Sequence, residues 1–216
     1  MNEAQGYENA FGALRQFIRR KRDVERCELC SAEVAADHPH LIEPGTRKLL
    51  CACNACAILF GGMGTKYKRV PRRVLALADF HLTDGQWESL MVPISMAFFF
   101  HSTPDGRVVA FYPSPAGATE SLLPLETWTE IEDANPVLKE IEPDVEALLV
   151  NRVGHARGFS AAEYYVLPID ECYKLVGLIR GNWRGLSGGT EVWQKIGEFF
   201  DGLKHRATLV REEANA

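Results

Sequence analysis

Two cysteine-rich strings, CELC at residues 27–30 and CACNAC at residues 51–56, decide the fold of the first third of the chain. They hold five of the six cysteines in the 216-residue sequence. Without an export signal thiols stay reduced, so the cluster indicates metal ligation rather than disulfide bonds. Two Cys-x-x-Cys pairs with 22 residues between them are typical of a tetrahedral four-thiolate zinc site. The predicted ligands of one structural zinc ion are Cys27, Cys30, Cys53 and Cys56.

Five cysteines compete for these four places. Cys51 and Cys53 are two residues apart, so on an extended strand both side chains point to the same face. We favour Cys53 because it forms a Cys-x-x-Cys pair with Cys56, which leaves Cys51 as a small buried thiol beside the site. Whether Cys51 replaces Cys53 stays open from the sequence. His38 and His40 are reserve ligands.

The identity of the metal is a second open question. Iron held by two Cys-x-x-Cys knuckles would make the chain an electron-transfer protein. Knuckles of that type usually have glycine after the second cysteine, whereas Ser31 and Ala57 stand in those places here. Zinc is therefore favoured. A closed four-thiolate zinc site has no open position for hydrolysis, so its role would be to fold and display the chain around it.

The residues around the cysteines predict a specific local fold. Residues 40–43 and 47–50 are strand-like and flank a Pro-Gly-Thr turn, and residues 54–60 begin a short helix that ends at Gly61. Knuckle, hairpin and helix in this order are typical of a treble-clef zinc finger. Treble-clef nucleases hold a catalytic ion with a histidine or asparagine in a long hairpin loop, and this loop is short and has neither. The sequence therefore does not support nuclease activity.

We predict three parts along the chain. Residues 1–25 contain an amphipathic helix over 5–22 that finishes in four basic residues. Residues 26–66 form the treble-clef-like zinc module. Residues 67–216 form an α+β domain, which begins in a basic stretch that looks like a linker.

Charge is divided unevenly along the chain. The net charge is −5, but residues 1–76 carry +5 and the remainder carries −10. A basic and an acidic part each offer a docking surface for a charged protein partner. A whole-chain pI of about 5.7 argues against broad nucleic-acid affinity.

The α+β domain shows two strand pairs followed by helices. Expected strands cover 94–102 with 107–112, and 145–151 with 164–167; expected helices lie around 126–133, 170–181 and 190–204. The string MAFFFH is apolar on both faces, as in a central strand. We interpret the segment as two degenerate ββα units that form a four-stranded, mainly antiparallel sheet with helices on one face.

Membrane and catalytic functions find little support. The longest near-apolar run, residues 91–100, is about half of a bilayer span. The N-terminus has no basic start followed by an apolar stretch, so we expect a cytoplasmic protein with no membrane span. No catalytic set is evident. The residues that neighbouring strand ends could bring together are His101, Asn151, Arg152, Tyr164 and Cys172.

Several long strings carry a family resemblance. They include ERCELC, HPHLIEPGTRKLLCACNACAILF, AFFFHST, EPDVEALLVNR, VLPIDECYKLVGLIR and WRGLSGGTEVW, in this order between about residues 24 and 203. The chain resembles a bacterial family of unknown function whose genes lie near those of uptake nickel-iron hydrogenases. The resemblance implies a non-enzymatic accessory protein that docks on a hydrogenase subunit or another maturation factor. It supplies no catalytic residue.

Overall fold

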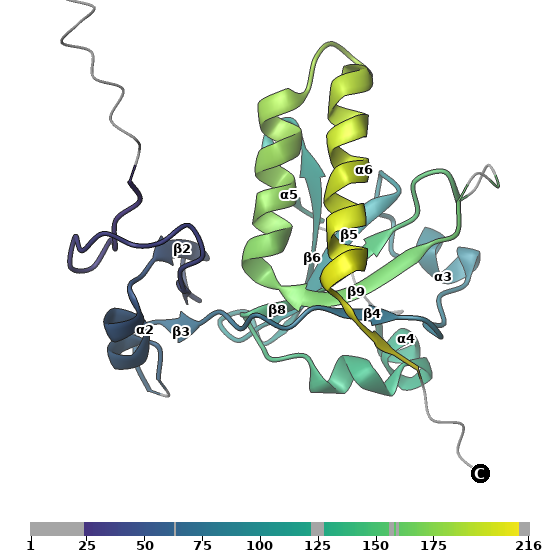
Figure 1. Ribbon diagram of the computed structural model, residues 1–216. Helices are drawn as coiled ribbons and strands as arrows, with labels where there is room; N and C mark the ends of the chain where they lie inside the picture. The colour runs from purple at the N-terminus through teal and green to yellow at the C-terminus, as the bar shows by residue number, and fades with distance from the viewer. Residues whose placement is uncertain (1–23, 63, 122–127, 156–157, 159, 212–216) are drawn as a thin grey trace, which may run out of the picture.

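The computed structural model describes residues 24–62, 64–121, 128–155, 158 and 160–211, and it contains two β-sheets. A small module carries the first sheet and stands beside a larger body that carries the second (Figure 1). The helix predicted over residues 5–22 lies outside the described residues. Mixed α+β architecture is confirmed. Within the described part of the chain, no helix combines the length and the apolar character needed to cross a bilayer.

The small module contains the predicted hairpin and helix. Strands β1 (His40–Glu43) and β2 (Lys48–Cys51) pair antiparallel, and the short strand β3 (Lys68–Arg69) pairs with the other edge of β1. Helix α2 (Asn54–Phe60) follows β2 directly. It ends at Gly61, where a side chain would collide with the backbone of α2 and with β1 and β3.

The hairpin uses its two faces for different purposes. Leu41 and Leu50 face each other across the strands and pack in a small core together with Cys27 and Cys56. Ile42 and Leu49 form the next pair, and their side chains pack against the core of the body instead. Because successive side chains of a strand alternate in direction, one hairpin can close the cysteine module and also attach it to the body.

The body is built on a seven-stranded sheet in the order β10-β4-β9-β8-β5-β6-β7. All neighbouring strands are antiparallel except the edge pair of β10 and β4, which is parallel. The bounds are β4 (Leu75–Leu77), β5 (Met96–Ser102), β6 (Arg107–Ser114), β7 (Gly117–Glu120), β8 (Glu146–Asn151), β9 (Glu163–Pro168) and β10 (Thr208–Val210).

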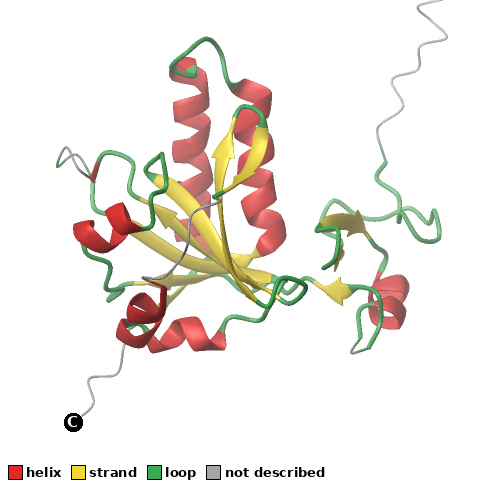
Figure 2. Cartoon of the chain, turned by 180° about the vertical axis from the view of Figure 1, so that it is seen from behind, coloured by secondary structure: helices red, strands yellow, loops and turns green. Residues whose placement is uncertain are grey.

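Helices cover both faces of this sheet (Figure 2). The long helices α5 (Ile169–Asn182) and α6 (Gly189–Arg206) pack on one face. The short helices α3 (Asp84–Ser89), α4 (Trp128–Ala134) and η1 (Pro136–Glu140) cover the other face.

The four-stranded sheet with helices on one face is therefore wrong in its details. Strand β5 shows why two layers are needed: Phe98 and Phe100 belong to the core under α5 and α6, whereas Ala97 and Phe99 belong to the core on the opposite face. A strand with large apolar residues in both directions must be covered twice.

The two ββα units also differ from the prediction. Both hairpins exist, β5 with β6 and β8 with β9. The helix after the first hairpin, α4, buries Ile131 on one face of the sheet, whereas α5 buries Cys172 and Leu175 on the other. A duplicated unit would place its helix on the same face each time, so the similarity is confined to the strand pairs.

Candidate metal centre

Four of the cysteines meet where the knuckle, β2 and α2 come together. The sulfur atoms of Cys27, Cys30, Cys53 and Cys56 all lie within 4.8 Å of one another. The Cys30 and Cys53 sulfurs are 3.7 Å apart, and all four thiols are free. This cluster could hold a metal ion, and its members are the four cysteines that the spacing selected.

The first cysteine pair sits on a tight turn. The backbone N–H of Ser31 donates to the carbonyl of Cys27, and the N–H of Cys27 donates to the carbonyl of Ala32, each over 2.8 Å. Ser31 adopts a φ of 63°, the left-handed region that glycine normally supplies. The knuckle thus forms without glycine, which weakens the sequence-based objection to iron.

The second pair is placed by the start of α2. The sulfur of Cys53 accepts a hydrogen bond from the backbone N–H of Cys56 over 3.4 Å, so Cys53 is the N-cap residue of the helix. Cys56 lies on the buried side of α2, one turn away. An i, i+3 pair at the start of a helix turns both sulfurs toward the knuckle.

Electrostatics of the four thiols favour a bound cation. Burial acts to raise the pKa of Cys27, but the N–H groups of Cys53, Cys30 and Leu29 outweigh it and lower the pKa to about 6. Burial and the neighbouring sulfurs raise the pKa of Cys56 to about 12. Without a metal ion, the protein therefore favours the thiolate form of Cys27 and disfavours the thiolate form of Cys56. A divalent cation removes that opposition, because it stabilises all four thiolates together.

Cys51 and the two reserve histidines lie in a separate group. One ligand atom from each of His38, His40 and Cys51 lies within 4.8 Å of the others. Cys53 belongs to the four-cysteine cluster and Cys51 does not. The sequence suggested one site with Cys51, His38 and His40 as alternative ligands, whereas the structure places these three residues in a group of their own.

The residues considered for a catalytic set are only partly brought together. Asn151 and Arg152 lie at the end of β8, beside Tyr164 of β9. His101 pairs with Val108 near one end of β5, whereas Asn151 pairs with Met96 at the opposite end of that strand. Cys172 is fully buried in α5, within the core between helix and sheet. Neighbouring strand ends thus bring Asn151, Arg152 and Tyr164 together, but not His101 or Cys172.

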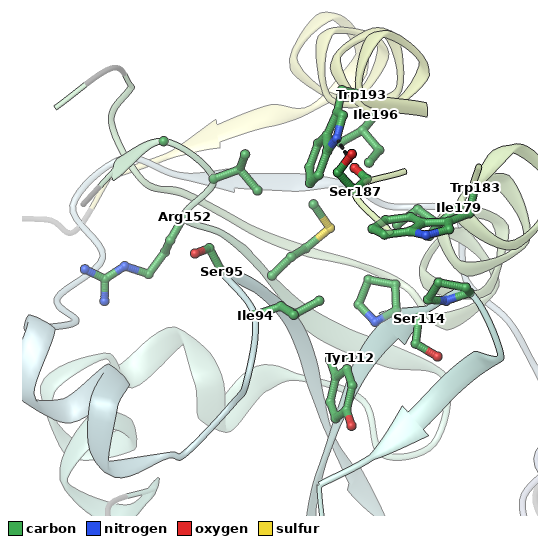
Figure 3. Close-up of a pocket in the computed structure, with 15 residues that line it drawn as sticks. Ile94, Ser95, Tyr112, Ser114, Arg152, Ile179, Trp183, Ser187, Trp193 and Ile196 are labelled. Atoms are coloured by element: carbon green, nitrogen blue, oxygen red, sulfur yellow. Dashed lines mark hydrogen bonds between the residues drawn. The ribbon is translucent and has the colours of Figure 1, made fainter. Parts of the chain in front are cut away.

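An apolar cavity of about 840 Å³ lies elsewhere in the body, at the ends of α5, α6 and β6. Trp183 and Trp193 line one side, and the Trp193 indole donates a hydrogen bond to the carbonyl of Ser187 (Figure 3). The charged end of Arg152 points away from the tryptophans and pairs with Asp84. The cavity has the apolar lining of a ligand site, and the described residues that line it do not form a group of acid, base and nucleophile.

We expect Cys172 to be chemically inert in the folded protein. Burial, reinforced by the charges of Asp170 and Glu171, raises the pKa of its thiol well above the usual value. Brief treatment of the native protein with iodoacetamide, followed by peptide mass spectrometry, should leave Cys172 unmodified, and denaturation should make it fully reactive. Native modification of Cys172 as fast as that of an unfolded control would contradict this assignment.

Comparison with known families identifies the family of this chain. A model described as "Family of unknown function (DUF5947)" matches residues 26–207. The chain belongs to this family. The match to DUF5947 covers the cysteine module and the body together, so both are part of the family's common unit. Comparisons with curated proteins and with solved structures found no significant match. The match confirms the predicted membership of a family of unknown function, and it assigns no activity to the chain.

Proposed function

We propose that this DUF5947 protein is a non-enzymatic zinc-binding accessory protein whose cysteine module docks on a protein partner. Cys27, Cys30, Cys53 and Cys56 hold one structural zinc ion. The observation that carries the proposal is the convergence of these four sulfurs at the junction of the knuckle, the hairpin and α2. Four thiolates complete a tetrahedral shell, so the ion holds the chain and leaves no position for a substrate.

The small size of the module explains why a metal is needed. Its core has six buried residues, two of which are the cysteines Cys27 and Cys56. So small an apolar core does not offset the conformational entropy of about 40 ordered residues. In this proposal residues 26–66 form the zinc module and residues 67–216 form the body that carries it.

The surface that the module displays is apolar. Ile58 and Leu59 at the end of α2 are 70% and 69% exposed, and Phe60 beside them is 43% exposed. Three adjacent exposed apolar residues on a metal-held helix are typical of a protein-binding surface. Following the gene context that the sequence resemblance implies, the proposed partner is a hydrogenase subunit or a maturation factor.

Metal content tests the first half of the proposal. Protein purified without added metal or chelator should contain one tightly bound zinc ion, measured by mass spectrometry, and should be colourless. About one iron ion with thiolate charge-transfer absorption would overturn the zinc assignment and would support the alternative, an iron-thiolate electron-transfer protein.

Affinity purification from the native host tests the second half. The wild-type chain should recover a hydrogenase subunit or maturation factor, and the Ile58→Ser, Leu59→Ser double variant should recover at least tenfold less. Leu186→Ser is the matched control, because Leu186 is a fully exposed leucine in the loop between α5 and α6. Recovery of no hydrogenase-related protein by the wild type would contradict the proposed partner.

A further inference from the structure

A second cluster of metal-ligating side chains lies outside the four-cysteine site. His40 and Cys51 are directly opposite each other in the β1–β2 ladder, and His38 precedes β1 by two residues. The rings of His38 and His40 are 4.8 Å apart and nearly perpendicular. Two imidazoles and a thiolate within 4.8 Å of one another form a donor set that suits zinc and other late first-row divalent ions.

Among the described residues, one ring nitrogen of His38 is buried and has no hydrogen-bond partner. Its Nδ1 lies 2.8 Å from the carbonyl oxygen of Ala35, so Nδ1 carries the proton and donates it. The side chain is 95% buried, and within the described part of the chain no hydrogen bond reaches its Nε2. An unpaired buried lone pair is costly unless something binds it. Because ligand atoms of His40 and Cys51 lie within 4.8 Å of a ligand atom of this ring, a metal ion is the partner that the neighbouring side chains favour.

His40 has the support expected of a metal ligand. Its Nδ1 lies 2.7 Å from the carboxylate oxygen Oδ2 of Asp170, in α5 of the body. A carboxylate that accepts from Nδ1 fixes the ring and makes Nε2 the free donor atom, as in carboxylate–histidine–zinc arrangements. Both histidines are therefore anchored through Nδ1, with Nε2 available to an ion.

The surroundings of Cys51 add negative charge. A carboxylate oxygen of Glu28 accepts a hydrogen bond from the backbone N–H of Cys51 over 2.8 Å. A carboxylate oxygen of Glu25 lies 3.5 Å from Nδ1 of His38. Two carboxylates close to three neutral or anionic ligands favour a cation at this position.

We propose that His38, His40 and Cys51 form a second metal site, which binds a divalent transition-metal ion through the two Nε2 atoms and the sulfur. Zinc is the ion that this mixed nitrogen and sulfur set fits best. Three protein ligands leave the fourth position of a tetrahedral ion open to water or to an added ligand. The site is thus exchangeable, in contrast to the closed four-thiolate site.

The second site would also join the module to the body. His40 belongs to β1 of the module, and Asp170 belongs to the first turn of α5. An ion bound to His40 polarises its Nδ1–H and strengthens the hydrogen bond to Asp170. Metal occupancy would therefore be communicated to the body through this one contact.

Metal titration of the full-length protein tests the proposal. The chain is stripped with chelator under reducing conditions and titrated with Co²⁺, which gives absorption bands when coordinated, and then with Zn²⁺. We expect two ions per wild-type chain and one per chain for Cys51→Ala. Cys172→Ala removes a cysteine outside both clusters and should keep two ions.

A second variant tests whether the hydrogen bond from His40 to Asp170 strengthens metal binding. Asp170→Asn should retain both ions but weaken the second about 10- to 100-fold, because the carboxylate partner of the ligand is lost. Wild-type binding of a single ion would overturn the proposal, as would two ions in Cys51→Ala. A variant-free check is that the second equivalent of Zn²⁺ should slow alkylation of Cys51 at least tenfold.

The experiments distinguish an error in the second metal site from an error in the four-cysteine zinc site on which the proposed function rests. Loss of the second ion alone leaves the four-cysteine zinc intact. Cys53→Ser should remove the tightly bound ion and unfold the module, so the exchangeable ion is lost with it, whereas Cys51→Ala should remove the exchangeable ion alone. Hydrogen exchange of residues 38–51 distinguishes the two losses, because only Cys53→Ser should accelerate it.

Discussion

Replacement of Cys27 by serine should abolish tight zinc binding and unfold the cysteine module. Cys27 is 1% exposed and lies at the centre of the small core of the module. Structural zinc in a four-ligand site contributes on the order of 10 kcal/mol to folding of the segment that binds it. The six buried residues that the structure describes in this core are too few to compensate for that loss, so the effect should be all or none.

The body provides an internal reference for this experiment. All four tryptophans of the chain, Trp87, Trp128, Trp183 and Trp193, lie beyond residue 76. In Cys27→Ser, hydrogen exchange of residues 26–66 should become at least a hundredfold faster, whereas tryptophan fluorescence should still report a cooperative unfolding transition. Cys51→Ser is the matched control and should keep the tight ion. A Cys27→Ser protein with wild-type protection of residues 26–66 would show that zinc does not hold the module.

The cysteine module was the part of the fold most accessible from the sequence. Ligand spacing is a geometric constraint, and it selected Cys53 over Cys51 without structural information. Hairpins β5–β6 and β8–β9 followed from short apolar runs on either side of turn signals, and α5 and α6 followed from helical periodicity. Each of these features depends on residues close together in the chain.

The features that the sequence did not predict depend on residues far apart in the chain. Strands β4 and β10 have three residues each and pair across more than 130 positions, so neither has a recognisable pattern alone. Which face a helix covers is likewise decided by packing. One feature of the second cluster could have been predicted from the sequence. If residues 40–43 pair with residues 48–51 in a hairpin, His40 lies opposite Cys51.

The uneven charge of the chain has an internal use. Arg47 of the module pairs with Asp105 and Glu120 of the body, and Lys68 pairs with the buried Asp144. Arg47 also lies over the ring of Phe111. Basic residues from the first part of the chain therefore meet acidic residues from the second part. Part of the charge asymmetry that suggested external docking is therefore used in contacts within the chain.

Arg73→Ala should cause a large loss of stability, because it leaves the buried carboxylate of Glu146 without its arginine partner. Glu146 is 1% exposed, and its carboxylate accepts from Nε and a terminal nitrogen of Arg73 over 2.5 and 2.7 Å. The Arg73 side chain is 45% exposed, so water reaches part of the pair. Removing one partner of a buried ion pair costs about 3–5 kcal/mol, and this partial exposure places the expected loss near 3 kcal/mol. Urea denaturation followed by tryptophan fluorescence should show a midpoint lower by roughly 1.5 M.

The neighbouring residue is a matched control for this prediction. Arg72 also pairs with an acidic residue, Asp37, but that pair is exposed on both sides, so Arg72→Ala should cost at most about 1 kcal/mol. Changing Arg73→Met and Glu146→Leu together should recover most of the loss, because the penalty comes from the orphaned carboxylate rather than from the missing attraction. Equal destabilisation by Arg72→Ala and Arg73→Ala would show that burial of Glu146 does not determine how much its ion pair with Arg73 contributes to stability.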